Sequence, residues 1–204
     1  MSEGTEKGET VKKGFTLMEM VVVVGIIGIL MAALLSGFGK APKKAERAKC
    51  QELVSNIATA MTAFFDENGA WPQRVIQNSN GTSGMDRDFA GWLKTIGVSV
   101  DTDGAERYGV VSPWAQAMLK NSKSATESSK VFGGGTVRSH RLLYAVDLDG
   151  DGIIEASVGG ENVKIRATAA VWCGGADGEI EKYAAGLKKD DVYSWGYGQT
   201  QSVK

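Results

Sequence analysis

A single carboxylate lies inside a long apolar segment near the start of the chain. Residues 15–38 read FTLMEMVVVVGIIGILMAALLSGF, and Glu19 is the only charged residue among them. A helix of that length would rise about 36 Å, enough to cross the hydrocarbon core of a bilayer with some tilt. An ionisable group in a membrane segment costs about 2.5–3.5 kcal/mol at the centre, and such groups are usually functional. We therefore expect Glu19 either to meet a cation or to reach the headgroups.

The acidic segment before residue 152 has the residue types that bind a hard cation. Asp147, Asp149 and Asp151 alternate before Gly152, as in the opening half of an EF-hand-type calcium loop. Val158 occupies the twelfth position, where that loop needs a bidentate glutamate. The pattern equally fits an acidic β-hairpin turn, because Asp-Gly is a strong hairpin signal. Calcium and a simple turn both remain open on these residues.

Two cysteines and one histidine leave little scope for thiolate or histidine chemistry. Cys50 and Cys173 could form a disulfide in an oxidising compartment, or both could be free thiols. No P-loop, zinc spacing or nucleophile elbow occurs, and His140 has no visible triad partner, so we expect a non-enzyme. The net charge of -1 gives no reason to expect a nucleic-acid-binding surface.

Hydrophobic periodicity predicts the elements that position these residues. Residues 39–68 continue the apolar helix as an amphipathic one, since Leu53, Ile57, Met61 and Phe64 recur at spacings of three and four. A helix packed on an antiparallel sheet would give a two-layer α+β head. The other predicted elements are short helices at 86–96 and 112–119, loops at 74–84 and 121–130, and strands at 142–146, 153–158, 163–173 and 192–195.

The segment Lys12–Met20, KKGFTLMEM, resembles the signal of type IV pilins and type II secretion pseudopilins. That signal is a basic leader, a glycine, Phe-Thr-Leu-Ile/Met-Glu and an apolar helix. The resemblance implies cleavage between Gly14 and Phe15 by a prepilin peptidase, with N-methylation of Phe15. It also implies that Glu19 pairs with the N-terminal amine of a neighbouring subunit. Such a pairing is physically reasonable, because a buried carboxylate is tolerated when it meets a cation.

The resemblance also implies an architecture and a location. The fold would be a pilin-like ladle, in which a long N-terminal helix packs its second half on a small antiparallel sheet. Its parts would be a leader (1–14), a transmembrane and polymerisation helix (15–38), the amphipathic half of that helix (39–68) and a globular head (69–204). The chain would cross the inner membrane once, with its head in the periplasm, before it joins a periplasmic or surface filament.

Two further segments resemble major pseudopilins. Residues 68–73, NGAWPQ, are similar to the turn that leaves the long helix in those proteins. Residues 174–195 are similar to their C-terminal segment, where aspartates and backbone carbonyls hold calcium. The resemblance implies that Asp177, Asp190 and Asp191 are calcium ligands.

These features favour a structural subunit of a type II secretion pseudopilus, which helps to move proteins across the outer membrane. Its partners would be copies of itself, the prepilin peptidase, an inner-membrane assembly platform and minor pseudopilins. The alternative is a type IV pilus or competence pilin that acts in adhesion, motility or DNA uptake. An anchored calcium-binding protein that never polymerises is a third interpretation.

Overall fold

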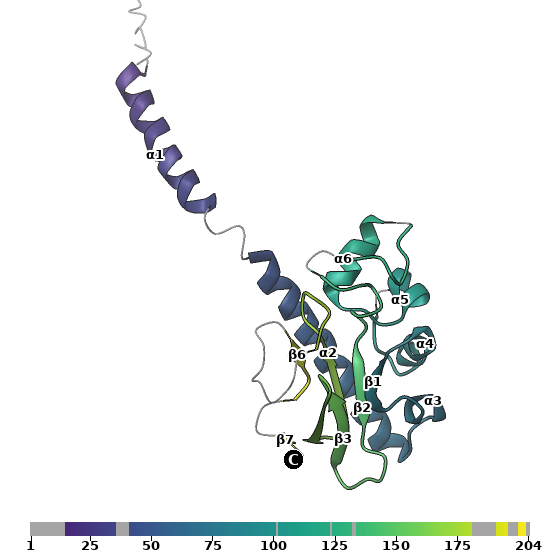
Figure 1. Cartoon of the computed structure of the whole chain (residues 1–204). Helices are drawn as coiled ribbons and strands as arrows, with labels where there is room; N and C mark the ends of the chain where they lie inside the picture. Colours follow the sequence, from purple (N-terminus) through teal and green to yellow (C-terminus); the bar gives the residue numbers. More distant parts are fainter. Residues whose placement is uncertain are drawn as a thin grey trace, which may run out of the picture. The chain divides into compact units, whose positions relative to one another are not determined.

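Figure 1 shows the computed structural model of the chain. The structure describes residues 15–35, 41–100, 102–122, 124–131, 134–180, 191–195 and 200–202. It divides into two compact units, Met1–Pro42 and Lys43–Lys204. The predicted leader lies outside the described residues, as do residues 36–40, where the sequence predicts that the long helix continues.

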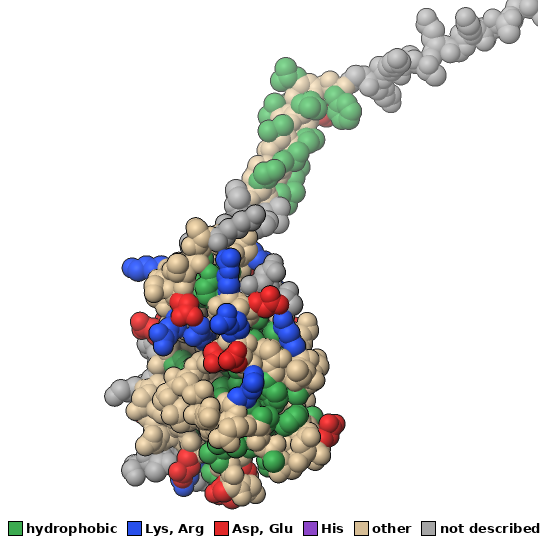
Figure 2. Space-filling view, turned by 90° about the vertical axis from the view of Figure 1, so that its right-hand side faces the viewer, with side chains coloured by type: hydrophobic (Ala, Val, Ile, Leu, Met, Phe, Trp, Pro, Cys, Tyr) green, Lys and Arg blue, Asp and Glu red, His purple; other side chains and the backbone are tan. Residues whose placement is uncertain are grey.

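The first unit contains one apolar helix, α1, at Leu17–Leu35. Its large apolar side chains are exposed, with exposed fractions between 44% for Val23 and 83% for Leu17. Figure 2 shows apolar side chains on the visible face of α1. Within the described residues, no helix is long and apolar enough to span a membrane.

The amphipathic helix α2, at Ala41–Asn68, lies in the second unit except for its first two residues. Ile57 and Met61 are completely buried, as the spacing predicts. Leu53 and Phe64 of the predicted stripe are partly buried, and Val54, which is not part of it, is completely buried. The helix ends where Gly69 adopts φ +67°, a left-handed conformation that glycine reaches without steric cost. The Gly69 amide then donates to the Phe65 carbonyl at 2.7 Å. The Asn-Gly signal in the sequence therefore marks this helix end correctly.

Two antiparallel sheets complete the core. The first has the strand order β1-β2-β5-β6 and the second has the order β3-β4-β7. The first sheet consists of β1 (Asn80–Gly84), β2 (Leu143–Val146), β5 (Ala169–Cys173) and β6 (Val192–Tyr193). The second consists of β3 (Ile153–Val158), β4 (Glu161–Arg166) and β7 (Thr200–Ser202).

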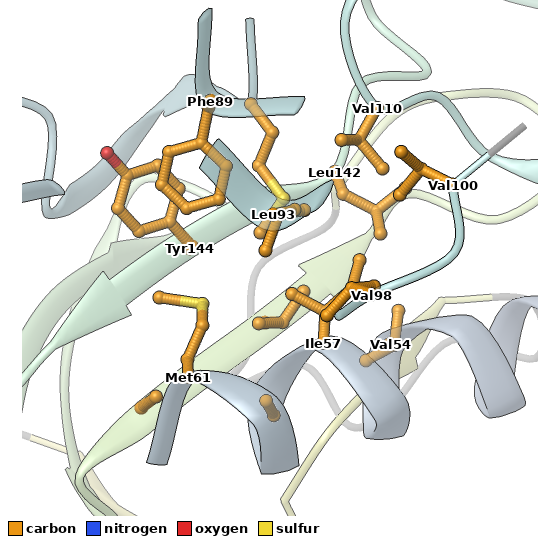
Figure 3. Close-up of a cluster of buried hydrophobic side chains, with 14 of the residues drawn as sticks. Val54, Ile57, Met61, Phe89, Leu93, Val98, Val100, Val110, Leu142 and Tyr144 are labelled. Atoms are coloured by element: carbon orange, nitrogen blue, oxygen red, sulfur yellow. The ribbon is translucent and has the colours of Figure 1, made fainter. Parts of the chain in front are cut away.

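Side chains of the central strands alternate between two hydrophobic clusters. Tyr144 and Val171 join the cluster that contains the buried face of α2. Ala145 and Trp172 join the cluster that contains the buried residues of β3 and β4. Figure 3 shows Val54, Ile57 and Met61 of α2 facing this packed interior. The head is thus three layers thick: helix, first sheet and second sheet. The α+β class is confirmed, and the predicted two layers become three.

Short helices flank this core. They are α3 (Gln73–Ile76), α4 (Arg87–Thr95), α5 (Thr102–Tyr108) and α6 (Pro113–Asn121). Asp86 caps α4, because its carboxylate accepts the Phe89 amide at 2.8 Å. The start of α6 at Pro113 agrees with the preference for proline in the first turn of a helix.

Two predicted segments differ from the structure. The predicted loop 74–84 contains most of α3 and all of β1, whose polar Asn-Gly-Thr-Ser-Gly sequence lacks any strand signal. The predicted strand 163–173 is two strands, β4 and β5. These two strands belong to different sheets, so the chain must turn between them at residues 167–168. Composition alone could not reveal that change of sheet.

A disulfide joins the first two layers. Cys50 on α2 pairs with Cys173 on β5, and both side chains are buried. The bridge spans a sequence separation of 123 residues. It therefore connects the first half of α2 to a central strand of the first sheet.

We expect loss of this bridge to destabilise the head strongly. A loop of this length corresponds to about 4–5 kcal/mol of lost chain entropy in the unfolded state. Reduction should lower the melting temperature by about 10 °C, as measured by circular dichroism with and without dithiothreitol. The Cys50→Ala, Cys173→Ala variant should melt low in both conditions. Equal melting of the native chain with and without reductant would indicate free thiols.

Candidate functional site

The N-terminal carboxylate forms a capping box at the start of α1. Thr16 donates its backbone N–H and its hydroxyl to Glu19 Oε2, each at 2.9 Å. The Glu19 amide donates in return to Thr16 Oγ1 at 3.2 Å. This reciprocal arrangement satisfies backbone donors that the first turn of a helix leaves unpaired. The carboxylate is therefore oriented, yet both residues remain exposed.

The capping box leaves the Glu19 carboxylate accessible to a positively charged group from outside the helix. A hollow of about 370 Å³ lies beside it, lined by Phe15, Thr16, Met18, Glu19, Val22 and Val23. A cation that arrived there would meet an oriented, exposed carboxylate beside apolar side chains. Phe15 and Glu19 are both present at this site, whereas Gly14 lies outside the described residues.

Thr16 is a site residue that the sequence reasoning did not single out. Its signal was present, because Thr-x-x-Glu before an apolar run is the sequence form of a capping box. The resemblance to pilin signals includes this threonine but implies no role for it. The structure shows that the two residues act together.

The acidic turn between β2 and β3 brings three predicted calcium ligands together. Carboxylate oxygens of Asp147, Asp149 and Asp151 lie within 4.8 Å of one another. Asp147 is buried, while Asp149 and Asp151 are exposed. Gly150 and Gly152 both have φ +79°, which lets the chain turn tightly enough to gather these groups.

Some carboxylate oxygens of this turn already accept hydrogen bonds from backbone amides. Asp147 accepts the amides of Gly150 and Gly152 at 2.8 Å through its two oxygens, and Asp151 accepts the Ile153 amide at 2.7 Å. These bonds are what an acidic hairpin turn needs. A calcium ion takes six to eight oxygen ligands, so this set fits calcium only with help from water or backbone carbonyls. Val158 is buried on β3 and offers no carboxylate.

The other predicted ligands lie apart from this turn. Asp177 accepts the Glu179 amide at 2.9 Å, and its backbone packs against Gly134 and Gly135. Asp191 is buried, and Tyr193 donates its hydroxyl to Asp191 Oδ2 at 3.1 Å. Within the described residues, neither aspartate belongs to a cluster of side chains close enough together to bind one metal ion. Asp190 lies outside the described residues.

His140 connects three segments of the head. Its side chain is completely buried, with Nε2 2.9 Å from the Gly134 carbonyl and Nδ1 3.1 Å from Ser112 Oγ. Because a carbonyl can only accept, Nε2 carries the proton and Nδ1 accepts from Ser112. A Cβ at Gly178 would lie 2.9 Å from the imidazole ring, so glycine permits this close packing. The ring is thus a structural link.

Comparisons with known proteins point to the same N-terminal motif. A family model described as the prokaryotic N-terminal methylation motif matches residues 10–35. The type IV major pilin protein PilE1 of Neisseria gonorrhoeae is 30% identical over 90 residues, which is 44% of this chain and 53% of that protein. This chain therefore spans about half the length of that relative. No solved structure matches this chain.

Two other relatives are covered over more of their length. The fimbrial protein EcpC of Eikenella corrodens is 32% identical over 111 residues, or 46% of this chain and 71% of EcpC. A ComG operon protein 3 homolog of Bacillus licheniformis is 32% identical over 71 residues, or 34% of this chain and 73% of the homolog. With this motif, fold and similarity, the chain belongs to the type IV pilin-like proteins.

We expect acid to destabilise the head through His140. Burial lowers the pKa of His140 below its usual 6.5, while the bond to Gly134 and the charge of Asp177 act in the opposite direction. The unfolded state therefore protonates the His140 imidazole more readily than the folded state does. The stabilising contribution is complete above pH 6.5 and is lost as the pH falls through the folded pKa.

Melting curves between pH 8 and pH 5 can check this expectation. His140→Gln retains a neutral donor and removes the titration, so its melting temperature should fall less steeply with acid than that of the native chain. Carboxylates titrate in both proteins, so the difference between them isolates His140. Parallel curves would contradict the assignment.

Proposed function

We propose that the chain is a structural subunit of an extracytoplasmic filament, made as a prepilin and cleaved between Gly14 and Phe15. The observation that carries this proposal is the oriented Glu19 carboxylate at the start of an apolar helix with exposed side chains. A surface of this kind must be covered by lipid or by other protein. Cleavage and N-methylation at Phe15 would supply a cationic amine four residues from Glu19.

The mechanism follows from that charge pair. Before assembly, residues 15–38 lie in the inner membrane and the head lies in the periplasm. During assembly, the apolar helices exchange lipid contacts for contacts with one another. The amine of an incoming subunit meets the Glu19 carboxylate of its neighbour, so two charges that are costly separately become tolerable together. Thr16 keeps the carboxylate oriented until the amine arrives.

Within the family, we propose a type II secretion pseudopilus as the particular assembly. The NGAWPQ turn after α2 and the C-terminal segment that ends at Trp195 support this choice by their similarity to major pseudopilins. The prepilin peptidase, an inner-membrane assembly platform and minor pseudopilins would then be its partners. Growth of the filament would help to move proteins across the outer membrane.

A type IV pilus or competence pilus is the second candidate. It is favoured by the names of the relatives, which are a major pilin, a fimbrial protein and a ComG protein. Deletion of the gene distinguishes the two. Loss of extracellular enzymes with normal motility and DNA uptake supports secretion, whereas the reverse result supports the second candidate.

The charge pair makes a direct prediction about Glu19. Glu19→Val should reduce sheared or sedimented filaments to below about a tenth of the native level, because an unpaired buried cation costs more than about 1.4 kcal/mol. Glu52→Val, which removes an exposed carboxylate from α2, serves as the matched control and should assemble normally. Mass spectrometry should show N-methylated Phe15 as the first residue of assembled subunits. Native filament yield from Glu19→Val, or filaments with an intact leader, would refute the mechanism.

We also propose that the head binds calcium as a structural ion. Asp147, Asp149 and Asp151 are the candidate ligands that lie together, and Asp149 and Asp151 face solvent. Asp177, Asp190 and Asp191 form the other candidate set, which rests on the similarity to pseudopilins alone. A bound ion would neutralise the clustered carboxylates and hold the turn between β2 and β3.

Chelation tests the calcium proposal and identifies the site. Removing calcium should lower the melting temperature of the head by about 5 °C, as expected for a ligand near a hundred times its Kd. Asp149→Asn with Asp151→Asn should abolish that difference if the turn is the site. Asp190→Asn with Asp191→Asn provides the parallel test of the C-terminal set. Identical melting in calcium and in chelator would exclude both.

A further inference from the structure

A hollow on one flank of α2 has the chemistry to receive a cationic side chain. Its volume is about 370 Å³, and it lies between α2 and the segments that carry Ala169 and Trp195. Its polar lining includes Thr59, Thr62 and Asp66. The hollow is open to solvent and large enough for one long side chain.

Three groups in the lining can interact with positive charge. Thr62 Oγ1 donates its hydrogen to the Ala58 carbonyl at 2.9 Å, so its remaining lone pairs can only accept. Asp66 is exposed and forms no ion pair within the described residues. The largely buried Trp195 also lines the hollow, and an indole is the best aromatic partner for a cation. Its ring is held by an edge contact with Trp172, at a centroid distance of 5.3 Å.

The same helix carries a cation with no partner of its own. Lys44 is exposed and makes no hydrogen bond or ion pair within the described part of the chain. By contrast, Lys49 pairs with Glu46 at 3.7 Å, and Arg47 donates to the Asp191 carbonyl at 3.4 Å. Residues 50–68 of α2 contain no Lys or Arg, so its C-terminal half is acidic.

We propose that the hollow beside Asp66 receives Lys44 of a second copy of this chain, forming a head-to-tail contact along the filament. The inference rests on the proposed filament function. Lys44 and Asp66 are 22 residues apart, or about 33 Å along a helix, so one copy cannot close the contact on itself. Contacts between two different patches of identical subunits produce open helical arrays when the rotation between copies does not close a ring. Parallel α2 helices joined in this way would be offset by about 33 Å.

A charge swap in the full-length chain, with Glu19 unchanged, tests the contact. Asp66→Lys and Lys44→Asp should each lower filament yield at limiting subunit concentration about fivefold. The double variant Lys44→Asp, Asp66→Lys should recover to within about twofold of the native yield, because the pair is restored in reverse. Glu67→Lys makes the same charge change one residue away, outside the hollow, and is the matched control. Asp66→Asn, which removes the charge without added bulk, should reduce the yield in the same direction.

Photo-crosslinking gives an independent measurement. A photoreactive residue in place of the exposed Thr59 should form adducts near Lys44 of a second copy. The proposal is overturned if Asp66→Lys behaves like Glu67→Lys, if the double variant shows no recovery, or if adducts map elsewhere. Filaments that survive Glu19→Val would instead count against the proposed function, so the two can fail separately.

Discussion

The central strands of the first sheet cannot face water on either side, and the head is organised around that constraint. All five residues of β5 are buried, and the strand alternates between two clusters. One face therefore needs the apolar side of α2, and the other needs the second sheet. Removing either layer would expose large side chains such as Tyr144 or Trp172, each of which contributes substantial buried apolar area.

This layered packing also positions the polar features at its edges. The acidic turn follows directly from β2. It begins at the buried Asp147, whose carbonyl accepts a hydrogen bond from the Trp71 indole at 2.6 Å. His140 lies just before β2, where it ties the start of α6 to the Gly134 segment. The hollow beside Asp66 forms where α2 passes the ends of the sheet. Each feature depends on the core, yet none is part of it.

The two compact units differ in how their polar features are built. In the first unit, Thr16 and Glu19 form a local device within one helical turn, which needs no tertiary contact. In the second, Asp66, Trp195 and the disulfide partners come from distant parts of the sequence. A local motif can therefore be shared by many relatives with different heads. This agrees with a family model that matches residues 10–35 alone.

The amino-acid sequence by itself determined the features that depend on nearby residues: α1, the buried stripe of α2, the helix end at Gly69 and most strands. It also contained the capping box, since Thr16 and Glu19 are three residues apart. Only the tertiary structure decided that the chain changes sheets after β4, that polar β1 pairs with β2, and that Asp147 lies apart from Asp177 and Asp191. Those outcomes depend on burial and pairing between segments far apart in the chain, which local periodicity does not encode.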